Sequence, residues 1–523
     1  MTSKLTDYVG YADAQAHFSR AGLWALFDGN EASLNITTEC IDRHVDTDTT
    51  ITVLRKSDPD ASFTMCEVAN WSNRVANFLL SEGVTKGDRV AIMLEPSLEF
   101  YFSLFGVMKA GAVAVPLYTL FGPDGLALRI DDCKPRILII APEKAEIAKR
   151  LGRDIRLVCA DESFKTTLSR HGSEFQAQTS PNDMAMYQYT SGTTRELPEA
   201  VKHRHRAVVT VMVAALYGTG IRPGDRYLCP SSPAWGHGLW HGTIAPLALG
   251  VSIWAWAGHY DAKRLLEALE HHRINNLSAA TTHYRLMKNS GVAARHQYVI
   301  DKLTYTGEPT DTSTEDFIIA TFGQRACSMY GTTEVGVILV NYPGAPDIKV
   351  KPRSLGKAVP GLRVEVHTPE GRVAAPHEVG EIVVEKAGEW VRTKDRGWTD
   401  EEGYFYHGGR ADDVIISAGW TMGVKEIEDT LLKHDAVAEV AVIGVPDALR
   451  GQVVKAYVVC RRDGTDRLIE ELQDFTRSRL SLHEYPRQIE FVSALPKTPS
   501  GKVNRQALRN QVAARVAAKP PGA

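Results

Sequence analysis

Between residues 90 and 280, short apolar runs alternate with segments that carry the spacing and capping residues of helices. Residues 90–94 form one such run, Ser97 offers a helix cap, and residues 98–109 stay almost wholly apolar until Gly111. Continuous apolar strands separated by helices indicate parallel sheets with helices on both faces. The same alternation predicts strands at 112–116, 137–140, 157–159, 184–187 and 276–279, and a helix that Asp261 caps and that continues to Ile274.

The pattern changes after about residue 360, where apolar and polar residues begin to alternate. Residues 362–366 and 380–385 both alternate in this way, and Gly371, Gly380 and Gly388 separate the runs. Alternation with a period of two is typical of antiparallel strands with one solvated face. The sequence therefore predicts a small antiparallel subdomain here.

The C-terminal part of the chain has the pattern of a compact α+β module. After a glycine- and aromatic-rich turn, we expect helices at 425–434 and 467–480, strands at 440–445, 454–459 and 488–492, and a frayed tail at 512–523. The predicted fold class is α/β. A large N-terminal domain, residues 1–409, would contain parallel-rich sheets and the β subdomain at about 355–409, and a small α+β domain would occupy residues 410–523.

Composition excludes several classes of protein. The 523 residues, 44% hydrophobic and 24% charged, exclude a collagen, a disordered chain and a disulfide-stapled miniprotein. The formal net charge of −3 gives no basic field for nucleic acid or anionic lipid. Seven scattered cysteines without a CxxC pair favour reduced thiols.

No targeting or spanning segment is expected. The first 20 residues lack a basic region followed by an apolar run, so a signal peptide is not predicted. Residues 100–122 are apolar but are broken by Lys109, Gly111 and Pro116, which indicates a buried helix leading into a buried strand rather than a membrane span. These features predict a cytoplasmic protein.

Hydroxyl side chains and one glycine, from Tyr189 to Thr194, directly follow the strand expected at 184–187. Such a loop can present backbone N–H groups and hydroxyls to phosphate oxygens, whereas a surface turn rich in Ser and Thr is the alternative interpretation. It is not a Walker loop, because no Gly-Lys-Ser/Thr follows.

Three further segments carry candidate chemistry. Lys502 comes directly after a Pro- and Gly-containing stretch that prevents helix and strand, so it is expected on a turn. It would be either a solvated charge or a positive group for an anionic reaction centre. Residues 409–419 join the two regions, where either a hinge or a charged surface turn would lie. Glu334 stands beside hydroxyls and could hold magnesium or be a surface acid.

Together, the order and composition of these four segments resemble the adenylate-forming (AMP-binding) superfamily of acyl-CoA synthetases, luciferases and peptide-synthetase adenylation domains. The resemblance covers nearly the whole chain and includes the segment 354–361, which ends at Gly361. Residues 120–124 and 233–236 make the chain most similar to bacterial short- and medium-chain acyl-CoA synthetases.

The resemblance implies roles for individual residues. Segment 189–194 matches the phosphate loop, 305–309 the adenine-side turn and 330–334 the adenine and magnesium motif. Tyr330 would stack on adenine, and Asp395 would accept from the ribose hydroxyls. The implied catalytic residues are Lys502, Glu334 and Thr190; the nucleotide-binding residues are Ser191, Gly192, Thr193, Thr194, Gly307, Glu308, Pro309, Tyr330, Gly331, Thr332, Thr333, Asp395, Arg410 and Gly419; the acid pocket is Trp235, His237, Trp240 and Gly331; the hinge is Asp412; and the magnesium ligand is Glu334.

The chain departs from the family pattern at several positions. Arg195 stands where the phosphate loop normally has glycine, and Glu199 where it has lysine, so Arg195 or Lys202 would have to supply a cation to the β/γ-phosphates. The usual Thr-Gly-Asp is Thr-Lys-Asp here, with Lys394 in the middle, and Thr421 replaces an arginine after the hinge. In acetyl-CoA synthetases a tryptophan at the position of Gly331 blocks the acyl pocket, so the glycine implies room for several carbons or a ring.

Two pairs of histidines have to be interpreted. His237 and His241 have the i, i+4 spacing of zinc ligands on a helix, but glycines interrupt the segment and no glutamate is adjacent, so acid-pocket residues are the favoured interpretation. His203 and His205 are predicted to lie on a solvated face.

The resemblance implies two half-reactions, in which a carboxylate and ATP give acyl-AMP and pyrophosphate, and coenzyme A then displaces AMP. ATP, Mg²⁺ and coenzyme A are the implied cofactors; the expected substrate is a short- or medium-chain or small aromatic acid. Between the steps the C-terminal domain would rotate about Asp412, withdraw Lys502 and present the face with Gly419. No nucleic-acid partner or membrane span is expected, and a homodimer is compatible with the resemblance.

Three alternatives remain at this stage. The acceptor could be a thiol other than that of coenzyme A, such as that of a carrier protein. The altered phosphate loop could belong to a nucleotide-binding pseudoenzyme. A zinc hydrolase built on His237 and His241 would need bound metal.

Overall fold

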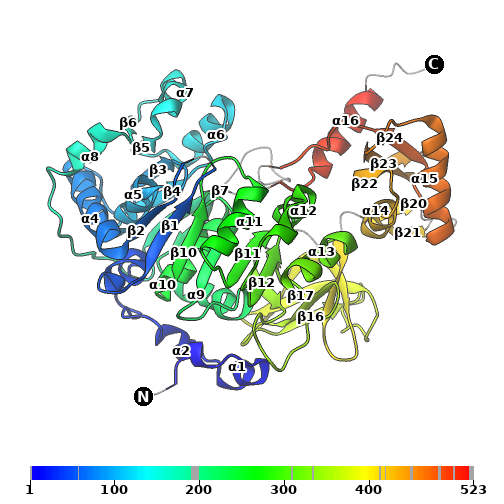
Figure 1. Cartoon of the computed structure of the whole chain (residues 1–523), viewed down its shortest axis with the longest axis horizontal. Helices are drawn as coiled ribbons and strands as arrows, with labels where there is room; N and C mark the ends of the chain where they lie inside the picture. Colours follow the sequence, from blue (N-terminus) through cyan, green and yellow to red (C-terminus); the bar gives the residue numbers. More distant parts are fainter. Residues whose placement is uncertain are drawn as a thin grey trace. The chain divides into compact units, whose positions relative to one another are not determined.

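Figure 1 shows the computed structural model, which describes residues 3–56, 58–189, 200–307, 310–332, 335–410, 414–417, 420–447, 451–480, 485–498 and 501–517. The chain forms two compact units: unit 1 comprises residues 1–331, 339–352 and 358–361, and unit 2 comprises residues 332–338, 353–357 and 362–523. The antiparallel strands after residue 362 thus share a unit with the C-terminal residues. A domain boundary between residues 409 and 410 stays a prediction.

Unit 1 contains two sheets, and the first has six strands in the order β6–β5–β3–β4–β7–β8. The first five strands are parallel, and β8 runs antiparallel to β7. Their bounds are β3 (Arg89–Met93), β4 (Val113–Pro116), β5 (Ile137–Ile140), β6 (Arg156–Cys159), β7 (Met184–Tyr189) and β8 (Ala200–Arg204).

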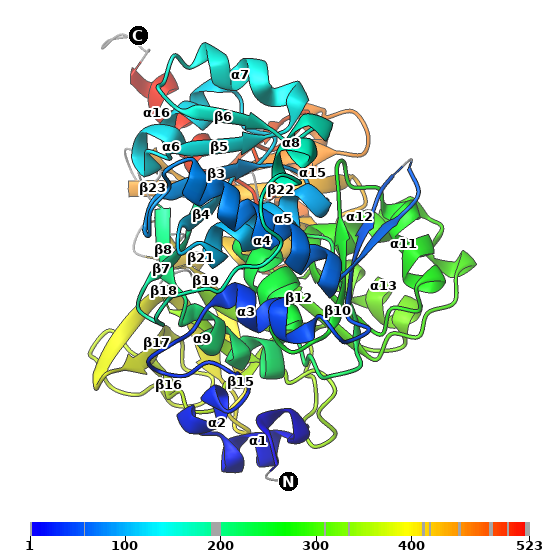
Figure 2. The ribbon, with the colours of Figure 1, turned by 90° about the vertical axis from the view of Figure 1, so that its left-hand side faces the viewer.

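Helices cover both faces of this sheet, as the alternating pattern predicted (Figures 1 and 2). The helix α5 (Leu98–Lys109) begins where Ser97 accepts a hydrogen bond from the Phe100 N–H at 3.1 Å, and Gly111 follows its end with a φ of 76°. Aromatic rings join α5 to α4 (Met65–Ser81) and α8 (Glu162–Leu168). On the other face, α6 (Pro123–Cys133) and α7 (Ala145–Arg150) bury apolar side chains against β3 and β5.

The second sheet of unit 1 runs β13–β12–β11–β9–β10–β1–β2. All its neighbours are parallel except the hairpin of β1 and β2 at the edge. The strands are β1 (Thr50–Leu54), β2 (Ala61–Thr64), β9 (Arg226–Cys229), β10 (Ser252–Trp256), β11 (Asn276–Ala280), β12 (Lys302–Thr306) and β13 (Cys327–Thr332).

One face of this sheet is covered by α11 (Ala262–His271), α12 (Thr281–Ser290) and α13 (Thr312–Phe322), which enclose a core of strand and helix side chains (Figure 1). Leu228 of β9 faces that core, whereas its neighbour Cys229 lies against Gly242 of the π-helix η5 (His237–Ile244). Since successive strand residues point to opposite faces, η5 lies on the other side of the sheet.

Asp261 caps α11 as predicted, by accepting from the Lys263 and Arg264 N–H groups. The helix nevertheless ends at His271 rather than at Ile274, because Arg273 takes a left-handed φ of 49° and turns the chain into β11. The shorter helices of unit 1 are η1 (Leu5–Asp7), α1 (Tyr11–His17), α2 (Arg20–Trp24), α3 (Ile36–Cys40), η2 (Asp42–His44), η3 (Pro142–Lys144), α9 (Ala207–Val213), η4 (Ala214–Gly218), α10 (Ala245–Ala248) and η6 (Ala293–Arg295).

In unit 2 the predicted antiparallel subdomain is present, with its strands in the order β16–β17–β18–β19–β15. Residues 403–409 do not form only a turn: Gly403 and Tyr404 turn around the Asp400 carboxylate and carbonyl, and β19 starts at Phe405. The strands are β15 (Ser354–Ala358), β16 (Val364–His367), β17 (Gly380–Lys386), β18 (Glu389–Thr399) and β19 (Phe405–Arg410); β14 (Gly336–Val340) precedes them.

The C-terminal module is α+β, as predicted. The long strands β22 (Val437–Asp447) and β23 (Gly451–Cys460) pair antiparallel and bury apolar side chains on both faces. The tail is not frayed from residue 512, because α16 (Arg505–Ala517) is helical and Val512 packs against one of these cores. The other elements are β20 (Val414–Ser417), β21 (Trp420–Gly423), α14 (Val424–Leu431), α15 (Asp466–Arg479) and β24 (Gln488–Phe491).

Residues 100–122 form α5 and β4 and the loops around them, and both elements are buried. A bilayer crossing would need a longer and more apolar helix than any that the described residues form.

Candidate active site

Many of the residues that the sequence nominates lie outside the described part of the chain. These are Thr190, Ser191, Gly192, Thr193, Thr194, Arg195, Glu199, Glu308, Pro309, Thr333, Glu334, Asp412 and Gly419. For Arg410 the backbone is described and the side chain is not. The geometry below therefore rests on the residues that flank these positions.

The adenine-side turn comes at the end of β12, and the predicted stacking tyrosine lies in the second half of the adjacent parallel strand β13. The register pairs Thr304 with Cys327 and Tyr305 with Ser328, and the Thr306 hydroxyl donates to the Met329 carbonyl at 3.2 Å. Gly307, with a φ of 98°, and Tyr330 therefore come at the same edge of the sheet. Carboxyl ends of parallel strands are where such sheets bind ligands.

The segment from Trp235 to Trp240 begins just after β9, at the same edge. A Cβ on Gly238 would come within 2.3 Å of the Ser231 and Ser232 carbonyls, so only glycine lets η5 lie this close to the preceding loop. Trp235 is half-buried and meets the His237 ring edge-on at 5.3 Å, whereas His237 and Trp240 are buried. Short π-helical segments are frequent at functional sites.

His237 is held by two serines, Ser231 from the loop after β9 and Ser278 from the middle of β11. Its Nδ1 lies 2.9 Å from the Ser231 hydroxyl and its Nε2 lies 2.8 Å from the Ser278 hydroxyl. Burial drives the pKa of His237 well below its usual value, so the ring is neutral. One ring nitrogen donates and the other accepts, which fixes the orientation of the imidazole.

The zinc interpretation of His237 and His241 lacks support. Both ring nitrogens of His237 already have serine partners, and no group of three or more potential metal ligands occurs among the described residues. His241 is buried, and burial lowers its pKa to about 4. A zinc site usually has three or four protein ligands.

Trp240 connects η5 to β7, the strand that precedes the predicted phosphate loop. Its indole N–H donates to Gln188 Oε1 at 2.9 Å, and Gln188 is the penultimate residue of β7. The sequence analysis did not identify Gln188. An amide side chain in a predicted buried strand could have indicated it, because a buried amide needs hydrogen-bond partners.

The prediction that His203 and His205 lie on a solvated face was wrong. His205 is fully buried and its Nδ1 accepts from the Ile36 N–H at 3.1 Å, while the His203 ring lies 4.8 Å from that of Trp240. Burial lowers the pKa of each to about 4. Charged residues alternate with these two histidines in the sequence and suggested a solvated segment. The side chains of a strand alternate in direction, however, and both histidines point inward, His203 from β8 and His205 from the turn after it.

Asp395, the predicted ribose acceptor, is a buried residue of unit 2. It stands opposite Arg410 in the register of β18 and β19, and the His407 Nε2 lies 3.6 Å from its carboxylate. Lys394 occupies the usual glycine position with a left-handed φ of 64°, and its N–H donates to Glu381 at 3.0 Å. The departure from Thr-Gly-Asp therefore keeps the backbone conformation that favours glycine.

Lys502, the predicted catalytic lysine, lies exposed on a tight turn of unit 2, as expected. Gly501 has a φ of 84°, and the Thr498 N–H donates to the Lys502 carbonyl at 2.7 Å. The bridge between Lys497 and Val503 closes this turn. A backbone fixed on both sides presents the lysine from a defined position.

Lys202, one of the two candidate phosphate cations, is exposed on β8. Its ammonium lies 5.3 Å from the centre of the Tyr187 ring, directly across from it in the register. Lys202 thus points to the opposite face of the sheet from Gln188 and His203.

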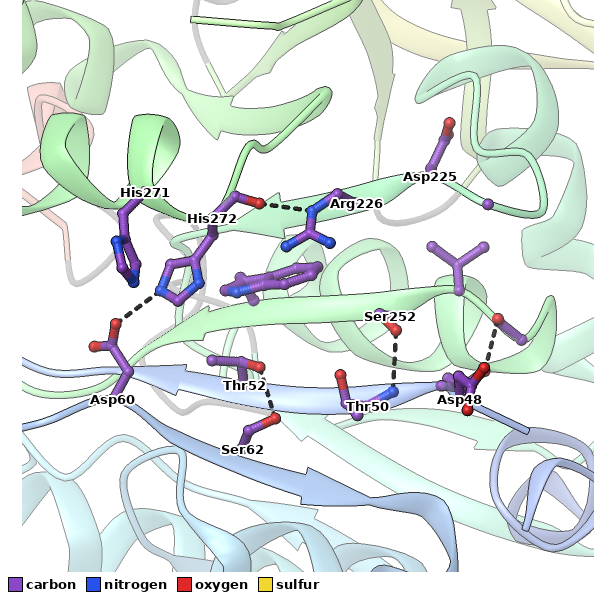
Figure 3. Close-up of a pocket in the computed structure, with 15 residues that line it drawn as sticks. Asp48, Thr50, Thr52, Asp60, Ser62, Asp225, Arg226, Ser252, His271 and His272 are labelled. Carbon is purple, nitrogen blue, oxygen red and sulfur yellow. Dashed lines mark hydrogen bonds and ion pairs between the residues drawn. The ribbon is translucent and has the colours of Figure 1, made fainter. Parts of the chain in front are cut away.

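A polar cavity of about 770 Å³ lies elsewhere in unit 1. Figure 3 shows that the first residues of three strands line it, and that Asp60 pairs with His272 at 2.8 Å. Asp60 also binds Arg264 through two contacts of 2.7 Å, and the Thr52 and Ser62 hydroxyls lie 3.1 Å apart. The cavity is at the amino ends of the strands, and none of the predicted site residues lines it.

Two family models match this chain, one in its N-terminal part and one in its C-terminal part. The AMP-binding enzyme family matches residues 41–390, and its C-terminal domain family matches residues 426–502. An uncharacterized acyl-CoA ligase, YtcI of Bacillus subtilis, is 33% identical over 84% of this chain and 88% of its own. A 4-hydroxybutyrate–CoA ligase of Metallosphaera sedula is 30% identical over 86% and 85%.

Solved structures that are similar to this chain include enzymes of the same kind. An acyl-CoA synthetase of Brucella canis has a TM-score of 0.75 and 30% identity, and covers 97% of this chain and 99% of its own. An anthranilate CoA ligase, AuaEII, in complex with anthranoyl-AMP, has a TM-score of 0.84 and 25% identity over 96% and 100%.

Proposed function

This chain belongs to the AMP-binding enzyme family, and from that premise we propose that it activates a short- or medium-chain or small aromatic carboxylic acid. The reaction class is that of an ATP-dependent acid–CoA ligase. The observation that carries the proposal is the adjacency of Gly307 and Tyr330 at the carboxyl ends of β12 and β13, in a chain with the family's motifs along its length.

In the first half-reaction, the substrate carboxylate attacks the α-phosphate of ATP and pyrophosphate leaves. Two anionic groups must approach each other, so charge stabilisation and positioning matter more than a protein nucleophile. We assign this role to Lys502, whose ammonium would bridge the carboxylate and the α-phosphate. Its exposed, hydrogen-bonded turn supports the assignment.

The nucleotide would be held by residues from several of the sequence motifs. Tyr330 would stack on adenine beside Gly307, and Asp395 would accept from the ribose hydroxyls with Arg410 nearby. The phosphate loop, Thr190 to Thr194, would hold the pyrophosphate, and Arg195 or Lys202 would supply the cation that the family pattern lacks here.

Magnesium fits the donor set around Glu334. A single carboxylate beside hydroxyls matches the preference of Mg²⁺ for few protein ligands plus phosphate oxygens and water. Glu334 would hold the ion, with Thr332 and Thr333 next to it, and the bound ion would neutralise phosphate charge.

In the second half-reaction the thiol of coenzyme A attacks the acyl carbonyl and AMP leaves. We propose that Asp412 is the pivot that withdraws Lys502 and brings the Gly419 segment to the reaction. The acid itself would lie against Trp235, His237 and Trp240, with Gly331 leaving depth for several carbons or a ring.

The test is a panel of acids from acetate through branched and medium-chain acids to benzoates, each with ATP and Mg²⁺. CoA-dependent formation of AMP and the acyl-CoA is expected for one of these classes. Pyrophosphate release that continues equally without coenzyme A, while no thioester forms, would indicate a different acceptor. If no acid releases pyrophosphate, the enzyme assignment itself is wrong.

A further inference from the structure

Three side chains from different elements meet on one face of the first sheet. The antiparallel register pairs Met186 with His203 and Gln188 with Val201, so Gln188 and His203 point to the same face as diagonal neighbours. Trp240 of η5 contacts both of them, through its indole nitrogen and through its ring. These three side chains therefore form a small polar cluster on this face.

The side-chain amide of Gln188 has a hydrogen-bond partner for its oxygen but not for its NH₂ group among the described residues. Trp240 donates to its oxygen, which fixes which end of the amide is the NH₂ group, yet no residue in the described part of the chain accepts from Nε2. Gln188 is 6% exposed, and a Cβ on Gly236 would lie 2.6 Å from that Nε2. The NH₂ group thus fills the side-chain position of residue 236, between the pocket residues Trp235 and His237.

The ring of His203 has an unused nitrogen beside the same indole. Its Nε2 is buried and has no hydrogen-bond partner among the described residues. Burial keeps the ring neutral, with a pKa lowered to about 4. A buried polar atom without a partner, such as His203 Nε2, is rare and destabilising, and the Gln188 NH₂ group on the same tryptophan also has no acceptor among the described residues. The two groups together point to a ligand that supplies the missing bonds.

We infer that the acid substrate carries a hydroxyl group, which Gln188 and His203 recognise. A hydroxyl can accept from the Gln188 N–H and can either donate to or accept from His203, so it satisfies the imidazole in both neutral tautomers. A carbonyl oxygen can only accept, so it would satisfy His203 only in the tautomer that carries the proton on Nε2. An alkyl chain would form a hydrogen bond with neither Gln188 nor His203. This inference rests on the proposed function, because it places the hydroxyl on the acid that the pocket binds.

The experiment compares matched pairs of acids: butyrate with 3- and 4-hydroxybutyrate, and benzoate with its three monohydroxy isomers. For at least one pair, kcat/KM should be about 10-fold to 100-fold higher for the hydroxy acid, because the unsubstituted acid leaves the Gln188 NH₂ group and the buried His203 Nε2 without a partner. Gln188→Leu should abolish that ratio by lowering kcat/KM for the hydroxy acid, with little change for the unsubstituted one. His203→Phe keeps a ring against Trp240 and should reduce the ratio in the same direction.

Gln506→Leu makes the same chemical change at an exposed position of α16 and should leave the ratio unchanged. If Gln188→Leu fails to fold, as judged by its melting curve, His203→Phe carries the test. Equal kcat/KM for both members of every pair in the wild type, or a ratio unaffected by the folded variants, would overturn the inference while the ligase activity stands. No CoA-dependent AMP from any acid would overturn both.

Discussion

The proposed role of Lys502 can be tested by measuring the two half-reactions separately, because the role belongs to the first of them only. One positive charge at the forming mixed anhydride should be worth about 3 kcal/mol, or about a hundredfold in rate. Lys502→Ala should therefore reduce acyl-AMP formation by at least that factor and spare thioester formation from supplied acyl-AMP. Pyrophosphate release and thioester formation are measured separately, and an equal loss in both would remove the assigned role.

Gly331 is expected to set the depth of the acid pocket. A glycine directly after Tyr330 leaves the volume that an indole would fill, and a pocket distinguishes acids by the carbons it can enclose. Gly331→Trp should move the preference towards acetate and propionate, measured as kcat/KM across chain lengths. A wild type that already prefers acetate to butyrate and benzoate would contradict this explanation.

Lys394 stores a small amount of backbone strain next to Asp395. Its left-handed φ of 64° is unfavourable for a residue with a Cβ and easy for glycine. Lys394→Gly should raise the free energy of unfolding by about 0.5 to 1 kcal/mol after the entropy cost of glycine is subtracted. Lys394→Ala removes the same side chain but keeps the Cβ, so it should give no such gain in urea unfolding.

The histidines show which site residues the sequence could reveal. The family resemblance makes His237 a candidate for the acid pocket, which stays a prediction, and the structure shows its ring buried between two serines. The prediction for His203 and His205 failed because side-chain direction depends on the register of β8 with β7, and register depends on residues far along the chain.

At the scale of elements, the N-terminus of α13 links folding to pH. Asp311 caps this helix by accepting from the Thr314 N–H at 2.9 Å, and its carboxylate also binds the Ser313 and Thr314 hydroxyls and Arg285. Burial acts to raise the pKa of Asp311, but the hydrogen bonds outweigh it and hold the pKa well below the usual value. The folded state thus prefers the carboxylate.

Asp311→Asn keeps a capping side chain and removes the titrating charge. A depressed folded pKa contributes stability that is complete above the unfolded pKa of about 4 and is lost as the pH falls towards the folded pKa. The variant should therefore be less stable than the wild type by about 1 to 2 kcal/mol at pH 7, and the difference should shrink at pH 3. Urea unfolding at the two pH values measures this, and an unchanged difference would exclude the charge as its cause.

Elements were predictable wherever a local signal determined them. The strand β5 and the helix α5 match their predicted ranges, because a continuous apolar run and a Ser97 cap are both local features. The end of α11 was missed by three residues because Ile274 continues the apolar period while Arg273 turns the backbone. The start of β19 at Phe405 was missed because glycine and aromatic residues also suit turns.

At the scale of the whole molecule, contacts between distant residues add what local patterns leave open. The change of pattern near residue 360 and the hinge motif predict a domain boundary at residue 410, and this stays a prediction. In the two compact units that the chain forms, the antiparallel strands lie in unit 2 with the C-terminal module. Within that unit, Arg353 pairs with Asp429 of α14 at 2.5 Å, a contact between residues 76 apart that no spacing rule could reveal.

The last prediction concerns the movement between the two half-reactions. If the C-terminal module rotates, a few backbone dihedrals must absorb the change, and the sequence nominates Asp412. Proline there would fix φ at about −65° and remove an N–H, so Asp412→Pro should trap one of two conformations. We expect the adenylating one to survive, because ATP and the acid bind mainly to residues of the N-terminal motifs and Lys502 needs a single geometry. Acyl-AMP should then accumulate while thioester formation falls by orders of magnitude, as measured by rapid quench with and without coenzyme A. Wild-type rates for both half-reactions would mean that the pivot lies at another residue or that no rotation occurs.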